Sequence, residues 1–203
     1  GEAEMCGNGA RCFGNFAAAL LHHDKTAPLP FETMAGVVTA TFEKDDNVTV
    51  NLTNPHSMQL FVLNADPTVG ADVHFLNTGV PHAVAFLDKL EGLDISRLGA
   101  YLRYHEAFSP KGTNANFARI LSPGHIAIRT YERGVEDETL ACGTGMTACA
   151  LLHAVLTDAP SPIQVDVAGG DTLKVGFQRT GDRFTDVTLT GPADLVFTGD
   201  IQI

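Results

Sequence analysis

The chain has 203 residues, of which 24 are acidic and 13 basic, so its formal net charge is −11. Its 44% hydrophobic and 18% charged residues exclude a disordered chain, and the acidic surface argues against a nucleic-acid partner, whose phosphates it would repel. No apolar run approaches the ~20 residues that span a bilayer, so no membrane partner is expected. The first residues lack the basic and apolar regions of a signal peptide, which predicts a cytoplasmic protein.

The elements expected in chain order begin with a glycine-rich motif, Cys6-Gly-Asn-Gly, and an apolar run that predicts a helix. A second helix is expected over residues 95–105 with Asp94 as its N-cap, and a third after Cys142-Gly-Thr-Gly. Alternating apolar residues bounded by turns predict strands over residues 36–42, 47–53, 57–63, 73–77, 83–87, 115–121, 125–132, 163–167, 173–177 and 184–189. Helices and strands do not alternate regularly, which favours an α+β fold.

The two glycine-rich motifs resemble each other. Cys6-Gly-Asn-Gly-Ala-Arg-Cys12 and Cys142-Gly-Thr-Gly-Met-Thr-Ala-Cys149 each precede an apolar run. They lie too far apart for a solenoid repeat of about 20–50 residues. The similarity therefore indicates two similar domains, each of mixed or antiparallel strands around a central helix.

A cysteine and two glycines at a helix start have a predictable chemistry. The first turn of a helix has unpaired N–H groups and a positive dipole end, which favour a bound carboxylate. The same position lowers the pKa of a cysteine. Two such thiols across a cleft suit inversion of a stereocentre, because one thiolate removes a proton and the other thiol delivers one to the opposite face.

Four stretches resemble the diaminopimelate epimerase family, in the family's order. They are Glu4-Met-Cys-Gly-Asn-Gly-Ala-Arg11, Tyr131-Glu-Arg-Gly134, Glu138-Thr-Leu-Ala-Cys-Gly-Thr-Gly145 and Gly191-Pro-Ala-Asp-Leu-Val-Phe197. The resemblance implies an enzyme that needs no cofactor and interconverts LL- and meso-diaminopimelate, for lysine and peptidoglycan synthesis. It also implies two similar α+β domains with the active site between them.

The resemblance assigns roles to particular residues. Cys6 and Cys142 would be the acid–base pair. The expected substrate contacts are Gly7, Asn8, Gly143 and Thr144, whose N–H groups would meet the reacting carboxylate, and Asn114, Glu132 and Arg133. His82 and Glu132 match residues that tune the pKa values of the cysteines.

Two features depart from the family pattern. Val80-Pro81-His82 replaces an Asn-Pro-His motif, so the contact of that asparagine is not carried over, although Asn77 is a candidate to replace it. The family's first domain also begins well upstream of its first cysteine. Residues 1–56, with 192–203 returning to them, are therefore expected to form part of an N-terminal domain, and residues 57–191 a complete C-terminal domain. On this basis the 203-residue polypeptide is expected to have little or no activity by itself.

The remaining polar residues receive simpler interpretations. Cys12 and Cys149 are expected to be core thiols, and Glu136-Asp137-Glu138 a solvated acidic loop. No metal site is expected, because neither motif has the paired cysteine or histidine spacing of a zinc site.

Other functions stay open beside the epimerase. One is another two-cysteine amino-acid racemase similar to proline racemase, and another is an inactive fragment of the epimerase. A relative of the phenazine-biosynthesis isomerase type is disfavoured, because that type lacks the cysteine pair. Family members are often homodimers, so a homodimer is one state that the resemblance allows.

Overall fold

The computed structural model describes residues 6–200, which form three α-helices, one short 3-10 helix and twelve strands. The helices are α1 (Gly7–Leu20), α2 (Ile95–Arg103), the 3-10 helix η1 (Glu106–Phe108) and α3 (Gly143–Thr157). The strands are β1 (Leu29–Thr33), β2 (Gly36–Phe42), β3 (Val48–Asn51), β4 (His56–Asp66), β5 (Ala71–Asn77), β6 (Pro81–Phe86), β7 (Asn114–Ser122), β8 (His125–Glu132), β9 (Asp137–Thr139), β10 (Ile163–Asp166), β11 (Thr172–Thr180) and β12 (Arg183–Gly191). The expected α+β class is confirmed.

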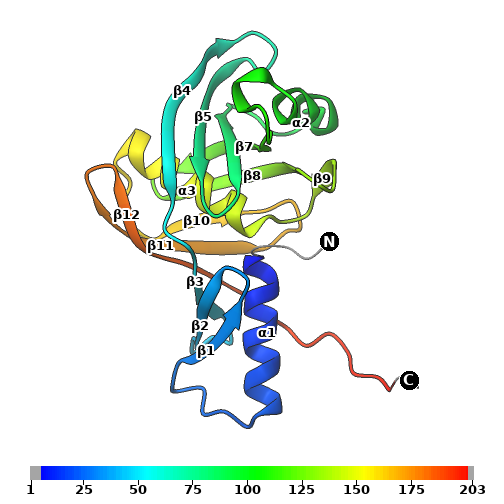
Figure 1. The fold of residues 1–203 in the computed structure, drawn as a ribbon, viewed down its shortest axis with the longest axis vertical. Coiled ribbons are helices and arrows are strands. Elements are labelled where there is room, and N and C mark those ends of the chain that lie inside the picture. The colour runs from blue at the N-terminus through cyan, green and yellow to red at the C-terminus, as the bar shows by residue number, and fades with distance from the viewer. Residues whose placement is uncertain (1–5, 201–203) are drawn as a thin grey trace.

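The strands form one mixed sheet in the order β1-β2-β3-β12-β11-β10-β8-β7-β6-β5-β4, with β9 added beside β8. Only the β6–β7 and β8–β10 pairs are parallel among these strands. Strand β12 pairs with β3, with Leu189 opposite Val50. This pairing joins the hairpins near the start of the chain to the larger part of the sheet (Figure 1).

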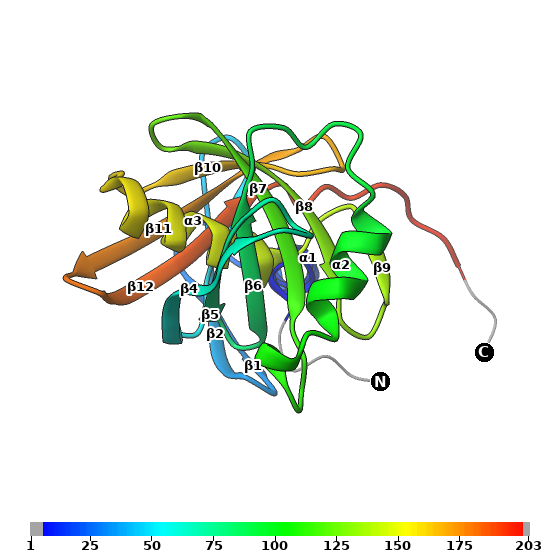
Figure 2. The same cartoon turned by 90° about the horizontal axis from the view of Figure 1, so that it is seen from above.

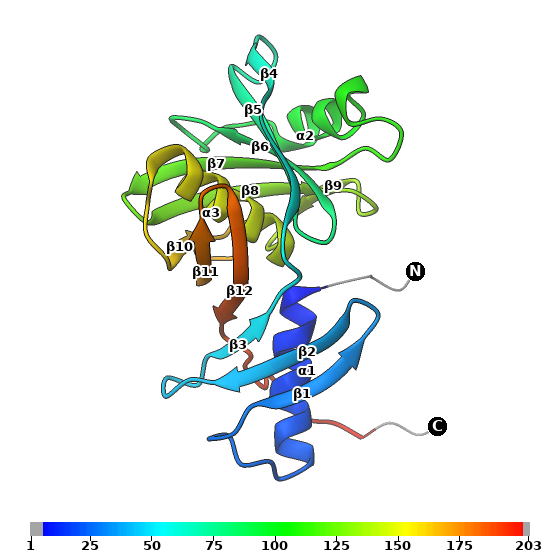
Figure 3. The ribbon, with the colours of Figure 1, turned by 60° about the vertical axis from the view of Figure 1, so that its left-hand side comes forward.

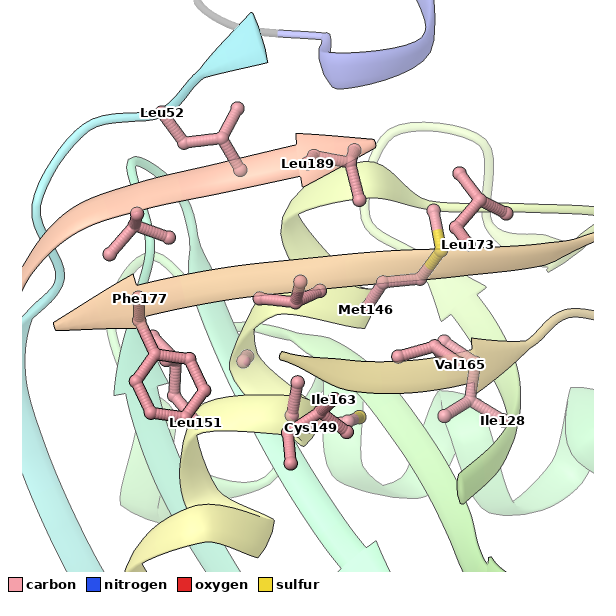
Figure 4. Packing of buried hydrophobic residues seen from close by; sticks show 14 of the residues in the cluster. Leu52, Ile128, Met146, Cys149, Leu151, Ile163, Val165, Leu173, Phe177 and Leu189 are labelled. Carbon is pink, nitrogen blue, oxygen red and sulfur yellow. The ribbon is translucent and has the colours of Figure 1, made fainter. Parts of the chain in front are cut away.

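Helix α3 is the central helix of the larger part. It contacts strands β5, β6, β7, β8, β10, β11 and β12, and Figure 2 shows these strands curving around it with α2 on their outer side. Its residues from Gly143 to Ala154 are all buried, as a helix that is apolar on every side requires. Figure 4 shows Met146 and Cys149 of α3 within the same core as Leu173 and Leu189 of the strands.

Helix α1 packs one face against β1, β2 and β3 (Figure 3). Ala10, Gly14 and Ala18 lie on the buried face. A Cβ atom on Gly14 would lie 2.7 Å from the Cβ of Ala40, so the close helix–sheet contact requires glycine there. Phe13 and Phe16 remain exposed, although the Phe13 ring lies 4.8 Å from the ring of Phe31 on β1.

The segment after β12 lies against α1. The Asn15 side-chain amide donates to the carbonyl of Ala193 at 2.7 Å, and the buried Arg11 donates to the carbonyl of Pro192 at 3.4 Å. The expected return of residues 192–203 includes 201–203, which lie outside the described residues, as do Glu4 and Met5 of the first motif. The division into two domains stays a prediction.

The ten expected strands and three expected helices are all present, with shifts of a few residues at their ends. Two short strands were not expected. Pro30 argues against a strand at β1 in the sequence, but β1 lies at the edge of the sheet, where proline is tolerated. The acidic-loop interpretation is wrong at Asp137 and Glu138, because both belong to β9, which pairs with β8, and Glu138 forms an ion pair with Arg129 at 2.6 Å.

Cys12 is also not a core residue. It is exposed on α1, whereas Cys149 is fully buried in α3 as expected. The two positions are similar in sequence, but α1 is covered by strands on one face only and α3 is surrounded by them.

Candidate active site

Cys6 is the N-cap of α1. Its backbone is extended, with φ −139° and ψ 105°, and its Sγ accepts a hydrogen bond from the N–H of Gly9 at 3.4 Å. The thiol is exposed. An N-cap side chain that accepts from the first turn satisfies one of the helix's unpaired N–H groups, so the motif begins the helix in the expected way.

Cys142 is the N-cap of α3 and has nearly the same backbone, with φ −122° and ψ 109°. Its surroundings differ, since only 8% of the residue is exposed. Its Sγ lies 3.5 Å from the hydroxyl of Thr144. The two motifs thus give the same local conformation in two different environments.

The starts of α1 and α3 meet at two glycines. A Cβ atom on Gly143 would lie 3.2 Å from the Cα of Gly7, and one on Gly7 would lie 2.8 Å from a methyl group of Leu189. A side chain on Gly7 would displace Leu189, and one on Gly143 would press on both Leu189 and the backbone of Gly7. The two positive helix ends therefore converge, and the residues of their first turns, which include Gly7, Asn8, Gly143 and Thr144, lie together.

The thiol of Cys142 is held protonated. Burial raises its pKa to about 12, and the nearby charge of Glu132 and, more weakly, of Cys6 acts in the same direction. Thr144 and the backbone of Gly145 act in the opposite direction. The expectation of a lowered pKa is wrong for Cys142. Burial away from water raises the pKa of the thiol by more than the positive end of the helix lowers it.

Polar residues lie on the sheet face beneath the start of α3. Side chains alternate between the two faces of a strand; on β6, β7 and β8 one face carries Val84, Ala118 and Ile128 of the core around α3. The same face carries, toward the strand ends near the cysteine, His82, Asn114, Asn116, Thr130 and Glu132. The polar side chains thus come from the β7–β8 hairpin and from β6, a strand that is distant along the chain and pairs with β7.

Asn114 positions the backbone of Arg133. Its side-chain oxygen accepts from the Arg133 N–H at 2.8 Å, and its amide donates to the carbonyl of Pro81 at 2.9 Å. The Arg133 guanidinium donates to the carbonyl of Lys111 at 3.3 Å. Glu132 accepts from the hydroxyl of Thr139. Glu132 and Arg133 are half-buried and belong to the same strand end.

A cavity of about 560 Å³ opens beside Arg133. Asn77, Pro81, Phe108 and Lys111 are among the residues that line it. Asn77, the candidate to replace the missing asparagine contact, accepts from the N–H of Gly79 at 2.9 Å. The cavity wall therefore carries two cationic side chains, Lys111 and Arg133, and two side-chain amides, Asn77 and Gln59.

Sequence reasoning missed Asn116 and Thr130. Both are buried, and they hydrogen-bond to each other at 3.0 Å. The sequence did contain a pattern that indicates Asn116, because Asn114-Ala-Asn116 puts two amide side chains on one face of a buried strand.

Within residues 6–200, no cluster of three or more histidine, cysteine or acidic residues has a geometry suited to a metal ion. Across the same described range, none of the helices is long and apolar enough to cross a membrane.

Comparison with known proteins connects this geometry to a family. The family model described as diaminopimelate epimerase matches residues 74–196. The diaminopimelate epimerase of Hydrogenobaculum sp. is 43% identical over 202 residues, which are 97% of this chain and 70% of that protein. The chain belongs to the diaminopimelate epimerase family. The protein of the same name from Aquifex aeolicus is 42% identical, over 98% of this chain and 70% of its own length.

Solved structures share the fold of this diaminopimelate epimerase family member at lower identity. A probable proline racemase from Agrobacterium radiobacter superposes with a TM-score of 0.67 at 20% identity, over 93% of this chain and 65% of that one. A phenazine biosynthesis protein from Bacillus anthracis gives 0.68 at 13% identity, over 94% and 74%. At these identities the likeness concerns the fold alone.

Proposed function

We propose that this protein is a diaminopimelate epimerase that interconverts the LL and meso forms by proton transfer between Cα and two thiols. The convergence of two cysteine-capped helices at Gly7 and Gly143 carries the proposal. It is supported by relatives of that name at 36–43% identity. No cofactor or metal enters the proposed reaction.

The proposed reaction moves two protons. The thiolate of one cysteine takes the proton from Cα, and the S–H of the other gives its proton to the opposite face of the carbanion, so that the stereocentre inverts. The N–H groups at the two helix starts hold the substrate carboxylate and stabilise the negative charge that develops beside it. Each turnover leaves the protonation states of the two sulfurs exchanged, because the first has gained the Cα proton and the second has given its own proton to the substrate.

The environments of the two thiols support a division of roles in the described state. Cys142 is buried and keeps its proton, because its pKa is raised to about 12. We therefore assign Cys142 as the proton donor and the exposed Cys6 as the base in the direction that starts from this state. In the reverse direction the roles are exchanged.

The substrate is tested by exchange of the Cα hydrogen in deuterium oxide. Diaminopimelate should exchange and epimerise, whereas proline should not. Exchange with proline and not with diaminopimelate would instead assign the chain to the second candidate, a racemase similar to proline racemase, whose fold it shares.

Matched alanine variants extend this test to the cysteines. Cys142→Ala should lower epimerisation by about 10²–10⁴-fold, the usual contribution of a positioned acid or base. Cys149→Ala removes a thiol from the same helix and should retain activity while lowering stability. Normal epimerisation by Cys142→Ala would contradict the two-thiol mechanism.

Several finer expectations remain proposals of the same kind. A cytoplasmic location and the absence of nucleic-acid and membrane partners accompany the small-molecule substrate of the epimerase assignment. A homodimer also stays a prediction.

A further inference from the structure

A buried hydrogen-bonded group lies behind the start of α3. It consists of His82 on β6, Asn116 on β7 and Thr130 on β8, each at most 2% exposed. The Asn116 amide nitrogen lies 3.1 Å from Nδ1 of His82 and 3.0 Å from the carbonyl oxygen of Ala83. The Thr130 hydroxyl donates to the Asn116 side-chain oxygen at 3.0 Å.

The partners of Asn116 fix the orientation of its amide. The carbonyl oxygen of Ala83 can only accept, so the Asn116 NH₂ group must face it. The Asn116 oxygen then faces Thr130, which donates. One amide hydrogen goes to Ala83, and the other is directed at Nδ1 of His82, which must be the acceptor.

An accepting Nδ1 determines where His82 carries its proton. A neutral imidazole has one donor and one acceptor nitrogen, so the proton lies on Nε2. The ring is neutral at physiological pH, because burial and, secondarily, the charge of Arg133 lower its pKa to about 3. Nε2 is buried and has no hydrogen-bond partner among the described residues.

The same group touches the helix that begins with Cys142. A Cβ atom on Gly145 would lie 2.4 Å from the Asn116 side-chain oxygen. His82 is also aligned in register with Asn114, which holds Arg133. The Nε2–H of His82, unpaired within residues 6–200, thus belongs to the layer directly beneath the start of α3.

We propose that Asn116 is a positioning residue that holds His82 in the tautomer with its proton on Nε2, so that His82 acts in the active site as a neutral hydrogen-bond donor to an anionic group. This inference rests on the proposed epimerase function and deepens it. It gives His82 a role without proton transfer, because its only basic nitrogen is already occupied by Asn116. A buried N–H donor aimed at developing negative charge stabilises it without reorganisation.

The tautomer can be measured directly on the full chain. In protein labelled with ¹⁵N-histidine, long-range ¹H–¹⁵N correlation spectra distinguish a protonated from an unprotonated ring nitrogen, and the spectrum of a His82→Gln variant identifies the His82 signals. Wild-type His82 should show a protonated Nε2 and an unprotonated Nδ1. Asn116→Asp should move the proton to Nδ1, because a carboxylate only accepts. Asn116→Ala should give a mixture of both tautomers.

Thr130→Val provides the matched control. It disturbs the same buried group but leaves both amide hydrogens of Asn116 in place, so the Nε2–H tautomer should persist. With diaminopimelate, Asn116→Asp should lower kcat by about 10–100-fold, by analogy with the loss of a partner that orients a metal-bound histidine.

Two outcomes would overturn the inference. One is a wild-type His82 with its proton on Nδ1, and the other is an unchanged tautomer in both Asn116 variants. Neither outcome bears on whether the protein epimerises diaminopimelate. Conversely, failure of the Cα exchange test would remove the proposed function and leave the tautomer result intact.

Discussion

At the scale of single residues, two similar motifs place their first cysteines in environments that differ in exposure to solvent. Cys6 and Cys142 cap their helices with nearly the same backbone angles, but Cys6 is exposed and Cys142 is buried. The helix position alone predicts a lowered pKa for both. For Cys142 the cost of placing a charge away from water is larger, so its pKa rises.

This difference predicts the order in which the thiols react. An unfolded cysteine ionises near pH 9 and folded Cys142 near 12, so at pH 8 Cys142 should be alkylated far more slowly than the exposed Cys12. Its raised pKa contributes stability that is fully present below pH 9 and is lost as the pH rises toward 12. Brief iodoacetamide treatment followed by peptide mass spectrometry measures the order. Labelling of Cys142 as fast as Cys12 at pH 8 would show that the site is open to solvent.

The residues that sequence reasoning missed share a physical cause. Asn116 and Thr130 are ordinary polar strand residues until their strands are placed side by side. Hydrogen bonding within the β7–β8 hairpin brings them together, and its register shifts between Ile120 and Ser122, an irregularity that strand alternation alone does not specify. The candidate cysteines, in contrast, were recognisable because their helix starts are local structures.

At the scale of elements, the two helix starts differ in how closely the sheet approaches them. Gly9 and Gly145 occupy the same place in their motifs. A Cβ atom on Gly9 would meet only Cys6 at 3.5 Å, an ordinary contact, whereas one on Gly145 would lie 2.4 Å from Asn116. The two similar motifs therefore both form helix starts, but only the start of α3 packs closely against a buried polar side chain, that of Asn116.

This comparison predicts opposite effects for the same substitution. Gly145→Ala should destabilise the protein by about 1–3 kcal/mol through overpacking and should lower epimerase activity by displacing the start of α3. Gly9→Ala should be neutral or slightly stabilising, since alanine favours a helix by about 1 kcal/mol over glycine. Denaturant unfolding and the Cα exchange assay measure both effects. Equal destabilisation by the two variants would contradict the difference in packing.

Most element types were predictable because strand alternation and helix starts are local. Strand β9 was not, because Asp137, Glu138 and Thr139 lack an apolar pattern and form a strand only by pairing with β8. The exposed face of α1 explains the error at Cys12. Whether a helix residue is buried depends on how many strands surround that helix, which the motif does not encode.

At the scale of the whole molecule, one continuous core joins the starts of both helices. The core includes Val50 from β3, Met146 from α3 and Leu189 from β12. Leu189 is fully buried, and its methyl group would lie 2.8 Å from a Cβ atom on Gly7 and 3.1 Å from one on Gly143. Leu189, seen within this core in Figure 4, therefore supports both glycines at the point where the helices converge.

Leu189→Ala should thus affect stability and activity together. A buried leucine replaced by alanine costs about 2–5 kcal/mol, and loss of its support should loosen the approach of α1 to α3. Val175→Ala on the neighbouring β11 serves as a control, because this fully buried partner of Leu189 is not among the atoms nearest to a Cβ on either glycine. Thermal unfolding and epimerisation are measured for both variants. Unchanged kcat in folded Leu189→Ala would remove the proposed support.

The sequence by itself determined the features that neighbouring residues establish. These are the two cysteine-capped helix starts, the α+β pattern of strands and turns, and the resemblance to a family. Only the tertiary structure decided which thiol is buried, which glycine is crowded and which nitrogen of His82 is left unpaired. Those properties arise from contacts between segments far apart in the chain, because loss of solvent and close packing depend on every element that surrounds a residue.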